Sequence, residues 1–340
     1  PFEHPDAFRR FRLMDDVEEL EQALEYPWER WTVFLHPVQQ TLVEKQFNGP
    51  VRVSGSAGTG KTIVALHRAL YLAKTSPDAR ILLTTFSEPL ARNLNKKLKI
   101  LAGNQPRILE RIEVAALESV AARLLASSGR GVSLVSNDTV AEVLKEVLSE
   151  TTEPLPRSKQ FVLNEWLNVV DAWQLEDWSS YKNFKRLGRK TRLAEAKRAA
   201  LWSVFEDLHR RLDERDFETL QAAFHHLASE FKSRKNKPYD YIVVDEAQDI
   251  SPMQLKFVSA LSAGGVNSLF FAGDLGQRIF QTPFSWVSLG VEIRGRSHTL
   301  RINYRTSHQI RSQTDRLLDN KVSDVDGNTE DRSGTVSVFN

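Results

Sequence analysis

Residues 54–62, SGSAGTGKT, combine a glycine, four further residues and a Gly-Lys-Thr end, which is the spacing of a phosphate-binding loop. Glycines in such a loop let backbone N–H groups turn inward around a phosphate, and the start of the following helix adds a positive dipole. Lys61 would reach the β- and γ-phosphate oxygens, while the Thr62 hydroxyl would ligate Mg²⁺. The pattern therefore predicts a nucleotide–Mg²⁺ site cradled by Ser56, Ala57, Gly58, Thr59 and Gly60.

An acidic pair at the end of an apolar run, in YIVVDEAQD (241–249), offers the second half of this chemistry. Asp245 would hold the hydrated Mg²⁺, and Glu246 is placed to polarise the attacking water. Acidic residues at strand ends are also common as solvated caps. Downstream of a phosphate loop, however, the pair favours nucleotide hydrolysis, because neither a kinase nor a simple nucleotide switch would need Glu246.

These groups need a scaffold, and short apolar runs along the chain predict one. The runs are rich in β-branched and aromatic residues and alternate with helical patterns, which indicates a parallel sheet covered by helices on both faces. Ligands of such α/β sheets gather at the carboxyl ends of the strands, where the charged and glycine-rich residues of this chain fall. The runs lie at 51–55, 81–86, 241–249, 268–274 and 298–303.

The pattern changes to helices between about residues 115 and 238, which predicts a helical insert within the α/β domain. Apolar residues in 137–150 recur at helical spacing, and Asn137 or Asp138 is the expected cap. The segment 151–158, TTEPLPRS, ends that helix.

A strongly basic stretch lies inside this insert, since residues 181–198 hold eight Lys and Arg against one acid, Glu195. It is either a solvated helix face or a track for a nucleic-acid backbone, because clustered cations release condensed counterions when they bind phosphates. The second interpretation makes candidate DNA contacts of Lys185, Arg186, Arg189 and Lys190.

The composition of the 340 residues excludes several classes of protein. No apolar run approaches the roughly 20 residues that cross a bilayer, and no signal-peptide pattern follows Pro1. Cysteine is absent, which excludes disulfides and thiolate metal sites and fits a reducing compartment. The length favours two compact units, and the missing initiator Met leads us to expect a fragment of a longer chain.

An ordered set of motifs, five besides the phosphate loop, resembles the amino-terminal half of UvrD/Rep-like superfamily 1 DNA helicases. DEAQD has the family form of the Mg²⁺ motif. The other four resemble the adenine-reading segment, the segment that contacts single-stranded DNA, GDxxQxIY and NYRS; they are LHPVQQ (35–40), TTFSEPLARNL (84–94), GDLGQRIF (273–280) and LRINYRT (300–306). The resemblance covers nearly the whole chain.

The resemblance implies a RecA-like P-loop fold with ATP and Mg²⁺ as cofactors, and it assigns roles to single residues. Gln39 would read the adenine with its amide, and Tyr304 would stack on the base. Gln277 would sense the γ-phosphate, and Arg305 would contact it across the domain cleft, where a guanidinium neutralises developing charge. Without the resemblance, Tyr304 would be read as a core aromatic and Arg305 as a surface charge. The implied catalytic set is Lys61, Glu246, Gln277 and Arg305.

For DNA, the resemblance implies an aromatic track that binds a single strand or a single/double-strand junction. Phe86 takes the place of the family's base-contacting aromatic residue, and Phe280 that of the Tyr in GDxxQxIY. Stacking tolerates any base, because every base has a π-face. Phe280 and Trp286 belong either to this track or to the apolar core.

The chain departs from the family pattern at three places. Ala116 and Glu118 stand where the family has a Thr-x-His-Ser-like DNA contact, so we expect that contact to be weakened or moved. Ile63 replaces an Arg that many relatives carry after the phosphate loop, which removes one phosphate contact. Thr282 replaces a base-stacking Trp of close relatives, and Phe284 or Trp286 is the expected substitute.

Motif positions predict the domain organisation. Residues 1–34 form an N-terminal helical extension, 35–114 and 239–299 the RecA-like ATP-binding domain, 115–238 the inserted helical subdomain, and 300–340 the start of a truncated second RecA-like domain. Translocation needs two lobes that close on ATP and open after hydrolysis. We therefore expect this chain to bind ATP–Mg²⁺ as a monomer and to hydrolyse it slowly.

The sequence thus predicts part of an ATP-dependent DNA helicase or translocase, with 3′→5′ polarity implied by the resemblance, in the cytoplasm and associated with the nucleoid. One alternative is a non-motor switch, in which ATP occupancy controls a partner or DNA binding without unwinding. Another places a nuclease or toxin-like domain elsewhere in the longer polypeptide. The acidic stretch before Gln39, residues 14–35, is expected to form a helix that either joins an upstream domain or stabilises this one.

Overall fold

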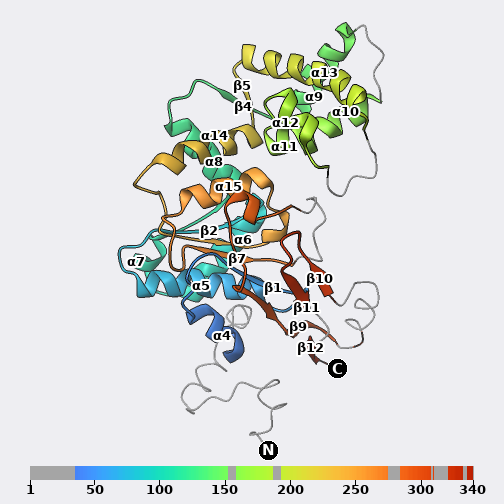
Figure 1. Ribbon diagram of the computed structural model, residues 1–340. Coiled ribbons are helices and arrows are strands. Elements are labelled where there is room, and N and C mark those ends of the chain that lie inside the picture. The colour runs from blue at the N-terminus through green and yellow to red at the C-terminus, as the bar shows by residue number, and fades with distance from the viewer. Residues whose placement is uncertain are drawn as a thin grey trace, which may run out of the picture.

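The computed structural model describes residues 35–151, 158–186, 193–274, 284–307, 309, 321–331 and 335–339. Its centre is a six-stranded sheet in which every pairing is parallel, with strand order β3-β2-β6-β7-β1-β8 (Figure 1). Five of the strands occupy the predicted apolar runs, and β3 is an additional edge strand, so the predicted α/β class is confirmed. The strands are β1 (Val51–Gly55), β2 (Ile81–Thr85), β3 (Ile112–Ala116), β6 (Tyr241–Val244), β7 (Leu269–Ala272) and β8 (Ser297–Leu300).

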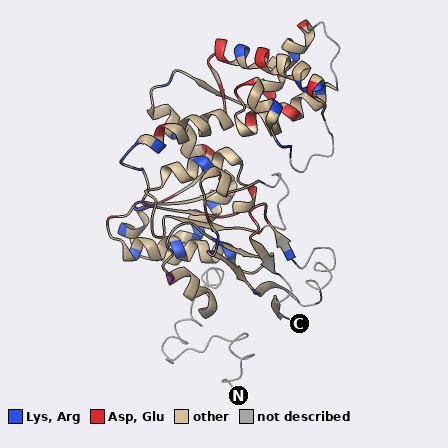
Figure 2. Ribbon diagram, viewed as in Figure 1, with Lys and Arg blue, Asp and Glu red and all other residues tan. Residues whose placement is uncertain are grey.

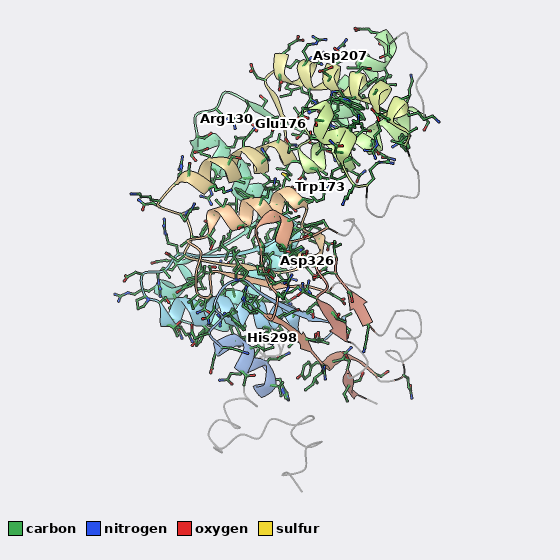
Figure 3. All side chains as sticks on the ribbon, in the orientation of Figure 1. Arg130, Trp173, Glu176, Asp207, His298 and Asp326 are labelled. Atoms are coloured by element: carbon green, nitrogen blue, oxygen red, sulfur yellow. The ribbon has the colours of Figure 1, made fainter. Side chains whose placement is uncertain are left out.

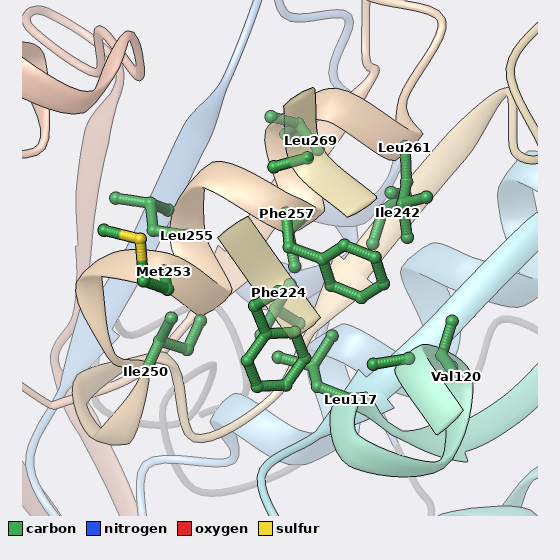
Figure 4. Packing of buried hydrophobic residues seen from close by; sticks show 14 of the residues in the cluster. Leu117, Val120, Phe224, Ile242, Ile250, Met253, Leu255, Phe257, Leu261 and Leu269 are labelled. Atoms are coloured by element: carbon green, nitrogen blue, oxygen red, sulfur yellow. The ribbon is translucent and has the colours of Figure 1, made fainter. Parts of the chain in front are cut away.

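Side chains alternate between the two faces of this sheet, and each face has its own hydrophobic core. In β2, Ile81 and Leu83 belong to one core, and Leu82 between them belongs to the other. In the second core Phe224 packs against Phe257, with ring centroids 5.1 Å apart (Figure 4). The first core is covered by α4 (Pro37–Glu44), α5 (Lys61–Thr75), α6 (Glu88–Ala102) and α7 (Pro106–Leu109), and the second by α8 (Leu117–Ser127), α14 (Leu220–Ser233) and α15 (Pro252–Leu261).

A helical body with a hydrophobic core of its own is inserted between α8 and α14 (Figure 1). Its first long helix begins after Ser136, whose Oγ accepts a hydrogen bond from the backbone N of Thr139. The predicted cap at Asn137 or Asp138 is therefore wrong, because both residues already lie in the first helical turn. The insert contains α9 (Asn137–Glu150), α10 (Lys159–Glu165), a π-helical turn (Trp166–Val170), α11 (Asp171–Trp173), α12 (Trp178–Asn183) and α13 (Glu195–Glu214).

The insert is joined to the sheet domain by a short parallel strand pair and by side-chain contacts. The Oδ1 atom of buried Asp171 accepts hydrogen bonds from Thr219 Oγ1 at 2.5 Å and from Gln174 Nε2 at 2.9 Å. Burial raises the pKa of Asp171 to about 6, although both hydrogen bonds oppose the shift. Nearby, Trp173, which Figure 3 labels, meets the ring of Phe284 edge-on, with ring centroids 6.0 Å apart. The connecting strands are β4 (Ser133–Val135) and β5 (Phe217–Thr219).

The last described residues form two small strand pairs beside the main sheet (Figure 1). One pair is parallel, β9 (Ile302–Ser307) with β12 (Val336–Phe339), and the other is the antiparallel hairpin of β10 (Lys321–Ser323) and β11 (Thr329–Asp331). Across the described part of the chain, no helix has the length and apolar character that a membrane crossing requires.

Candidate nucleotide-binding site

The glycine-rich loop connects the end of β1 to the start of α5, which is the strand–loop–helix setting that its spacing predicts. Gly58 and Gly60 have φ angles of +83° and +84°, in the left-handed region that glycine enters without steric cost. A Cβ atom on Gly60 would lie 2.6 Å from Nε2 of Gln39. Glycine at this position therefore lets the Gln39 side chain reach the loop.

The Lys61 ammonium lies within the loop. Its Nζ donates to the carbonyl oxygens of Gly55 at 2.7 Å and of Ser56 at 3.1 Å. An ammonium has three N–H donors, so one remains for a phosphate oxygen. The Ser56 hydroxyl is buried and has no hydrogen-bond partner among the described residues. A buried, unsatisfied hydroxyl costs free energy, and a phosphate oxygen would satisfy it.

The two predicted Mg²⁺ ligands are neighbours. Thr62 is hydrogen-bonded to the carboxylate of Asp245, which is 5% exposed at the end of β6. Burial raises the pKa of Asp245 to about 7, and the negative charge of Glu246 adds to the shift, against the hydrogen bond from Thr62 and the charge of Lys61. A hydroxyl beside a carboxylate whose charge is poorly solvated fits Mg²⁺, which takes one or two carboxylates together with substrate phosphates.

Glu246 has a left-handed backbone, with φ +54° and ψ +43°, which costs a non-glycine residue about 1 kcal/mol or more. Its Oε2 accepts a hydrogen bond from Gln248 Nε2 at 2.7 Å, and Gln248 Oε1 accepts one from the backbone N of Asp274 at 3.0 Å. A Cβ on Gly273 would lie 2.7 Å from that Oε1 atom. Gln248 thus connects the predicted base to the beginning of the 273–280 segment.

The reasoning from sequence missed Gln248, although its place two residues after Glu246 was a signal. Residues i and i+2 of one turn can share a hydrogen bond, and Gln248 lies in the 3₁₀ turn Ala247–Asp249 that directly follows Glu246. Its second contact, to the backbone N of Asp274, links the predicted strand regions 241–249 and 268–274, which the sequence does not show to be in contact.

Helix α4 presents Gln39 to the phosphate loop. Gln39 Nε2 donates to the carbonyl oxygen of Thr59 at 2.9 Å, and its Oε1 accepts from the backbone N of His36 at 3.0 Å. His36 caps the helix, since its Nδ1 accepts from the backbone N of Val38 at 3.2 Å. Both ends of the amide are thereby oriented. The remaining donor and lone pair match the N7 acceptor and N6 donor of adenine.

Strand β9 contacts the loop from the other side. Asn303 Nδ2 donates to the carbonyl oxygen of Ala57 at 2.8 Å, and the backbone N of Tyr304 donates to that of Gly58 at 2.9 Å. The Tyr304 ring lies 5.6 Å from the ring of His36, with planes inclined by 40°. Tyr304 therefore stands beside the helix that carries Gln39, the other residue predicted to contact the adenine.

Several predicted residues lie outside the described residues. Their roles stay predictions, although the backbone of residue 305 is described within β9 and the backbone of 273–274 beside Gln248. Outside the description are the extension 1–34, Gln277, Phe280, Thr282, Arg189, Lys190 and the side chain of Arg305.

The aromatic residues predicted for DNA differ in position. Phe86 is half-buried between the end of β2 and the start of α6. Trp286 is 2% exposed and its ring meets that of Phe271 edge-on at 4.7 Å, within the core beneath α15. The core alternative therefore describes Trp286 in this structure, because a buried ring offers no face to a DNA base.

The predicted basic track is only partly on the surface. Arg186 Nη2 donates to Glu165 Oε2 at 2.5 Å, and the two side chains are 5% and 0% exposed. Arg186 is thus a buried structural cation of the insert, whereas Lys185 is exposed.

A different basic face, on α6, was missed. Residues 89–109 contain five Lys and Arg and no acid. Arg92, Lys96 and Lys99 are exposed and share one face of the helix, at i, i+4 and i+7. None of them forms an ion pair within the described part of the chain. The insert differs, because Arg210 and Arg211 of α13 are paired with acids.

At the departure from the family's DNA contact, the structure brings two carboxylates together. Ser119 Oγ donates to the carboxylate of Glu88. Burial raises the pKa of Glu118, and the charge of Glu88 raises it further. Ala116 is buried at the end of β3. This part of the predicted DNA face therefore carries negative charge in place of a phosphate contact.

Known proteins are similar to this chain in sequence. The model of the UvrD/REP helicase N-terminal domain matches residues 35–282. A probable DNA helicase II homolog of Mycoplasma capricolum is 22% identical over 80% of this chain, and a putative ATP-dependent DNA helicase of Bacillus subtilis, YjcD, is 25% identical over 78%. The ATP-dependent DNA helicase PcrA of Staphylococcus aureus is 25% identical over 71%. The chain spans 39%, 36% and 33% of the lengths of these three relatives.

Proposed function

The chain belongs to the UvrD/Rep helicase family, and we propose that it is the ATP-binding and DNA-contacting part of an ATP-dependent DNA helicase or translocase. The observation that carries the proposal is that three elements meet at the phosphate loop. Gln39 of α4 and Asn303 of β9 donate hydrogen bonds to backbone carbonyls of the loop, and Thr62 at the end of the loop is hydrogen-bonded to Asp245. The relatives' names include ATP-dependent DNA helicases. We further propose 3′→5′ movement and a cytoplasmic, nucleoid-associated location.

In this proposal each group at the loop has one task. The third N–H of Lys61 and the Ser56 hydroxyl bind phosphate oxygens. Thr62 and Asp245 hold Mg²⁺, which when bound neutralises negative charge on the β- and γ-phosphates. Glu246 accepts a proton from the attacking water, and Gln248 holds its carboxylate in place. Gln277 and Arg305 keep the γ-phosphate roles that the family resemblance implies.

DNA contacts follow from charge and exposure. The exposed cations of α6 have no acidic partner among the described residues, so they remain available for phosphates. Helix α6 begins with Glu88, two residues after Phe86, and its basic face begins one turn later at Arg92, so this face lies on the helix that follows the predicted base contact. The insert differs, because its helices carry Lys and Arg interspersed with Asp and Glu (Figure 2).

The experiment is a measurement of ATP hydrolysis with and without single-stranded DNA, on this chain and on the longest natural polypeptide that contains it. We expect both to bind ATP–Mg²⁺ and DNA to accelerate hydrolysis in the longer protein. Directional movement on a labelled single strand is the decisive readout. Tight ATP binding that alters DNA affinity without turnover or movement would support the non-motor switch.

A further inference from the structure

Strand β1 contains a buried cation, Arg52, three residues before the phosphate loop begins at Gly55. Its Nη1 donates to Asp324 Oδ2 at 2.8 Å, and the side chains are 3% and 4% exposed. The guanidinium also lies within 3.4 Å of the Ser297 hydroxyl and 6.0 Å from the centre of the Trp286 ring. The ion pair joins the nucleotide-binding strand to the β10–β11 hairpin, 272 residues further along the chain.

The turn of this hairpin, residues 324–328, is organised around the same carboxylate. Asp324 Oδ1 accepts hydrogen bonds from the backbone N of Asn328 at 2.8 Å and of Asp326 at 3.1 Å. Such side-chain-to-backbone bonds are how Asp fixes a tight turn. The turn therefore presents Asp324 to Arg52 in one orientation.

A second aspartate of the turn holds another segment. Asp326 Oδ2 accepts from the backbone N of Trp286 at 2.7 Å and of Val287 at 3.2 Å, and its Oδ1 accepts from the Ser285 hydroxyl. Asp326 thereby caps the 3₁₀ turn Val287–Leu289, and Figure 3 shows it where the hairpin meets the body of the domain. This turn follows the segment 273–280, which carries Gln277.

The contact of the hairpin with β1 and with residues 285–287, called the joint below, is suited to remain closed. Separating one partner from a buried ion pair leaves an uncompensated charge, which costs far more than opening a solvated surface contact. Motion between lobes must then occur elsewhere.

We propose that the hairpin 321–331 is a fixed anchor of the first lobe, in contrast to the domain boundary at residue 300 that the motif positions predict, and that Asp324 and Asp326 are positioning residues for the nucleotide site. Asp324 holds β1, which leads into the phosphate loop, and Asp326 holds the segment after Gln277. The consequence for motion during the ATP cycle rests on the proposed motor function.

The first test uses the absence of natural cysteine in the chain. Val287 and Val325 are exposed and flank the joint, so Val287→Cys/Val325→Cys places two labels across it without altering either aspartate. Spin labels at these sites should report the same separation without nucleotide, with ADP and with a non-hydrolysable ATP analogue. A change of more than about 5 Å between these states would overturn the fixed anchor. This readout needs no ATPase activity, so it does not depend on the proposed function.

The second test bridges the same two cysteines with a short bismaleimide. Turnover of the bridged protein should stay within about twofold of the same variant treated with a monofunctional maleimide. A drop of tenfold or more, in a protein whose untreated form hydrolyses ATP, would show that the hairpin must move. Absence of turnover in every form would count against the motor function, while the spin-label result would still decide the anchor.

The positioning role has its own readout. Asp324→Asn should weaken binding of a fluorescent ATP analogue at least fivefold at a temperature where circular dichroism shows the fold intact. The double variant Arg52→Met/Asp324→Leu replaces the pair by apolar side chains, a change that often restores stability. It therefore separates a loss of nucleotide binding from a loss of stability. If Asp324→Asn binds nucleotide like the parent protein, or if its loss of binding follows only its loss of stability, the positioning role is overturned.

Discussion

Gln248 donates a hydrogen bond through Nε2 to Oε2 of Glu246, at 2.7 Å. The other end of the same amide accepts from the backbone N of Asp274. One side chain therefore holds the predicted general base and also contacts the segment that carries Gln277. A carboxylate that must accept a proton from water needs a fixed position more than it needs a special environment.

We expect Gln248→Ala to lower ATP turnover by about tenfold to a hundredfold, because the carboxylate of Glu246 loses its orienting donor. ATP affinity should change little, since the hydrogen bonds of Gln248 in the described part of the chain go to Glu246, Asp249 and Asp274 and not to the phosphate loop. Steady-state kinetics, separated into kcat and KM, measure both effects. Gln254→Ala is the matched control, because this buried Gln caps α15 and should affect stability without affecting kcat. A change in KM alone would contradict the orienting role.

Two of the four proposed catalytic side chains, Glu246 and Lys61, should have different effects when they are replaced. Glu246→Gln keeps the shape of the site but cannot accept the proton, so it should bind ATP normally and lose hydrolysis by at least a hundredfold. Lys61→Ala should weaken ATP binding at least tenfold, because the loop loses its cation. Calorimetric titration with a non-hydrolysable analogue and a phosphate-release assay separate the two. Normal hydrolysis by Glu246→Gln would remove Glu246 as the base.

Reversing charge on α6 should weaken DNA binding in a salt-dependent way. For Lys96→Glu/Lys99→Glu we expect at least tenfold weaker binding to single-stranded DNA. The slope of log K against log salt should fall by about 1 to 2, because each lost phosphate contact contributes about 0.7. Arg210→Glu on α13 is the control, since that arginine is already paired with Asp207 and Glu214. An unchanged salt slope would show that this face does not meet DNA.

The buried carboxyl of Asp171, where the insert meets the sheet domain, should make the free energy of unfolding depend on pH. Because burial raises the pKa of Asp171 to about 6 from its usual value near 3.8, the folded state holds a proton that the unfolded state releases. Its stabilising contribution is complete below about pH 4 and is lost as the pH rises through 6. Above pH 6, the free energy of unfolding of Asp171→Asn should therefore exceed that of the parent protein by up to about 3 kcal/mol. Below pH 4 the two values should be equal.

Chemical denaturation at a series of pH values measures this difference. An Asn Oδ1 can still accept from Thr219 and Gln174, so the hydrogen bonds are retained. Asp171→Ala removes the acceptor and should lose stability at every pH. Equal stability of parent and Asp171→Asn at pH 7 would contradict the raised pKa.

Local patterns in the sequence were sufficient for the sheet, for the strand–loop–helix at residues 54–62 and for the place of Asp245 and Glu246 at a strand end. These features depend on residues within one turn or strand of each other, and elementary sterics and hydrophobic periodicity determine them. The roles of Gln39 and Tyr304 needed the family resemblance, because nothing in their local pattern separates a base contact from a core residue.

The tertiary structure alone decided what each exposed or charged residue touches. Trp286 and Arg186 fit a DNA track by type, but the packing around them buries both. The α6 cations are proposed to bind DNA because they have no acidic partners in the described part of the chain. The role of Arg52 follows from its ion pair with an aspartate 272 residues away. Spacing along a chain determines neighbours within an element, whereas burial and long-range ion pairs are properties of how the elements pack. The sequence by itself therefore determined the fold class and the nucleotide motif, and only the packed structure decided which side chains hold that motif in position.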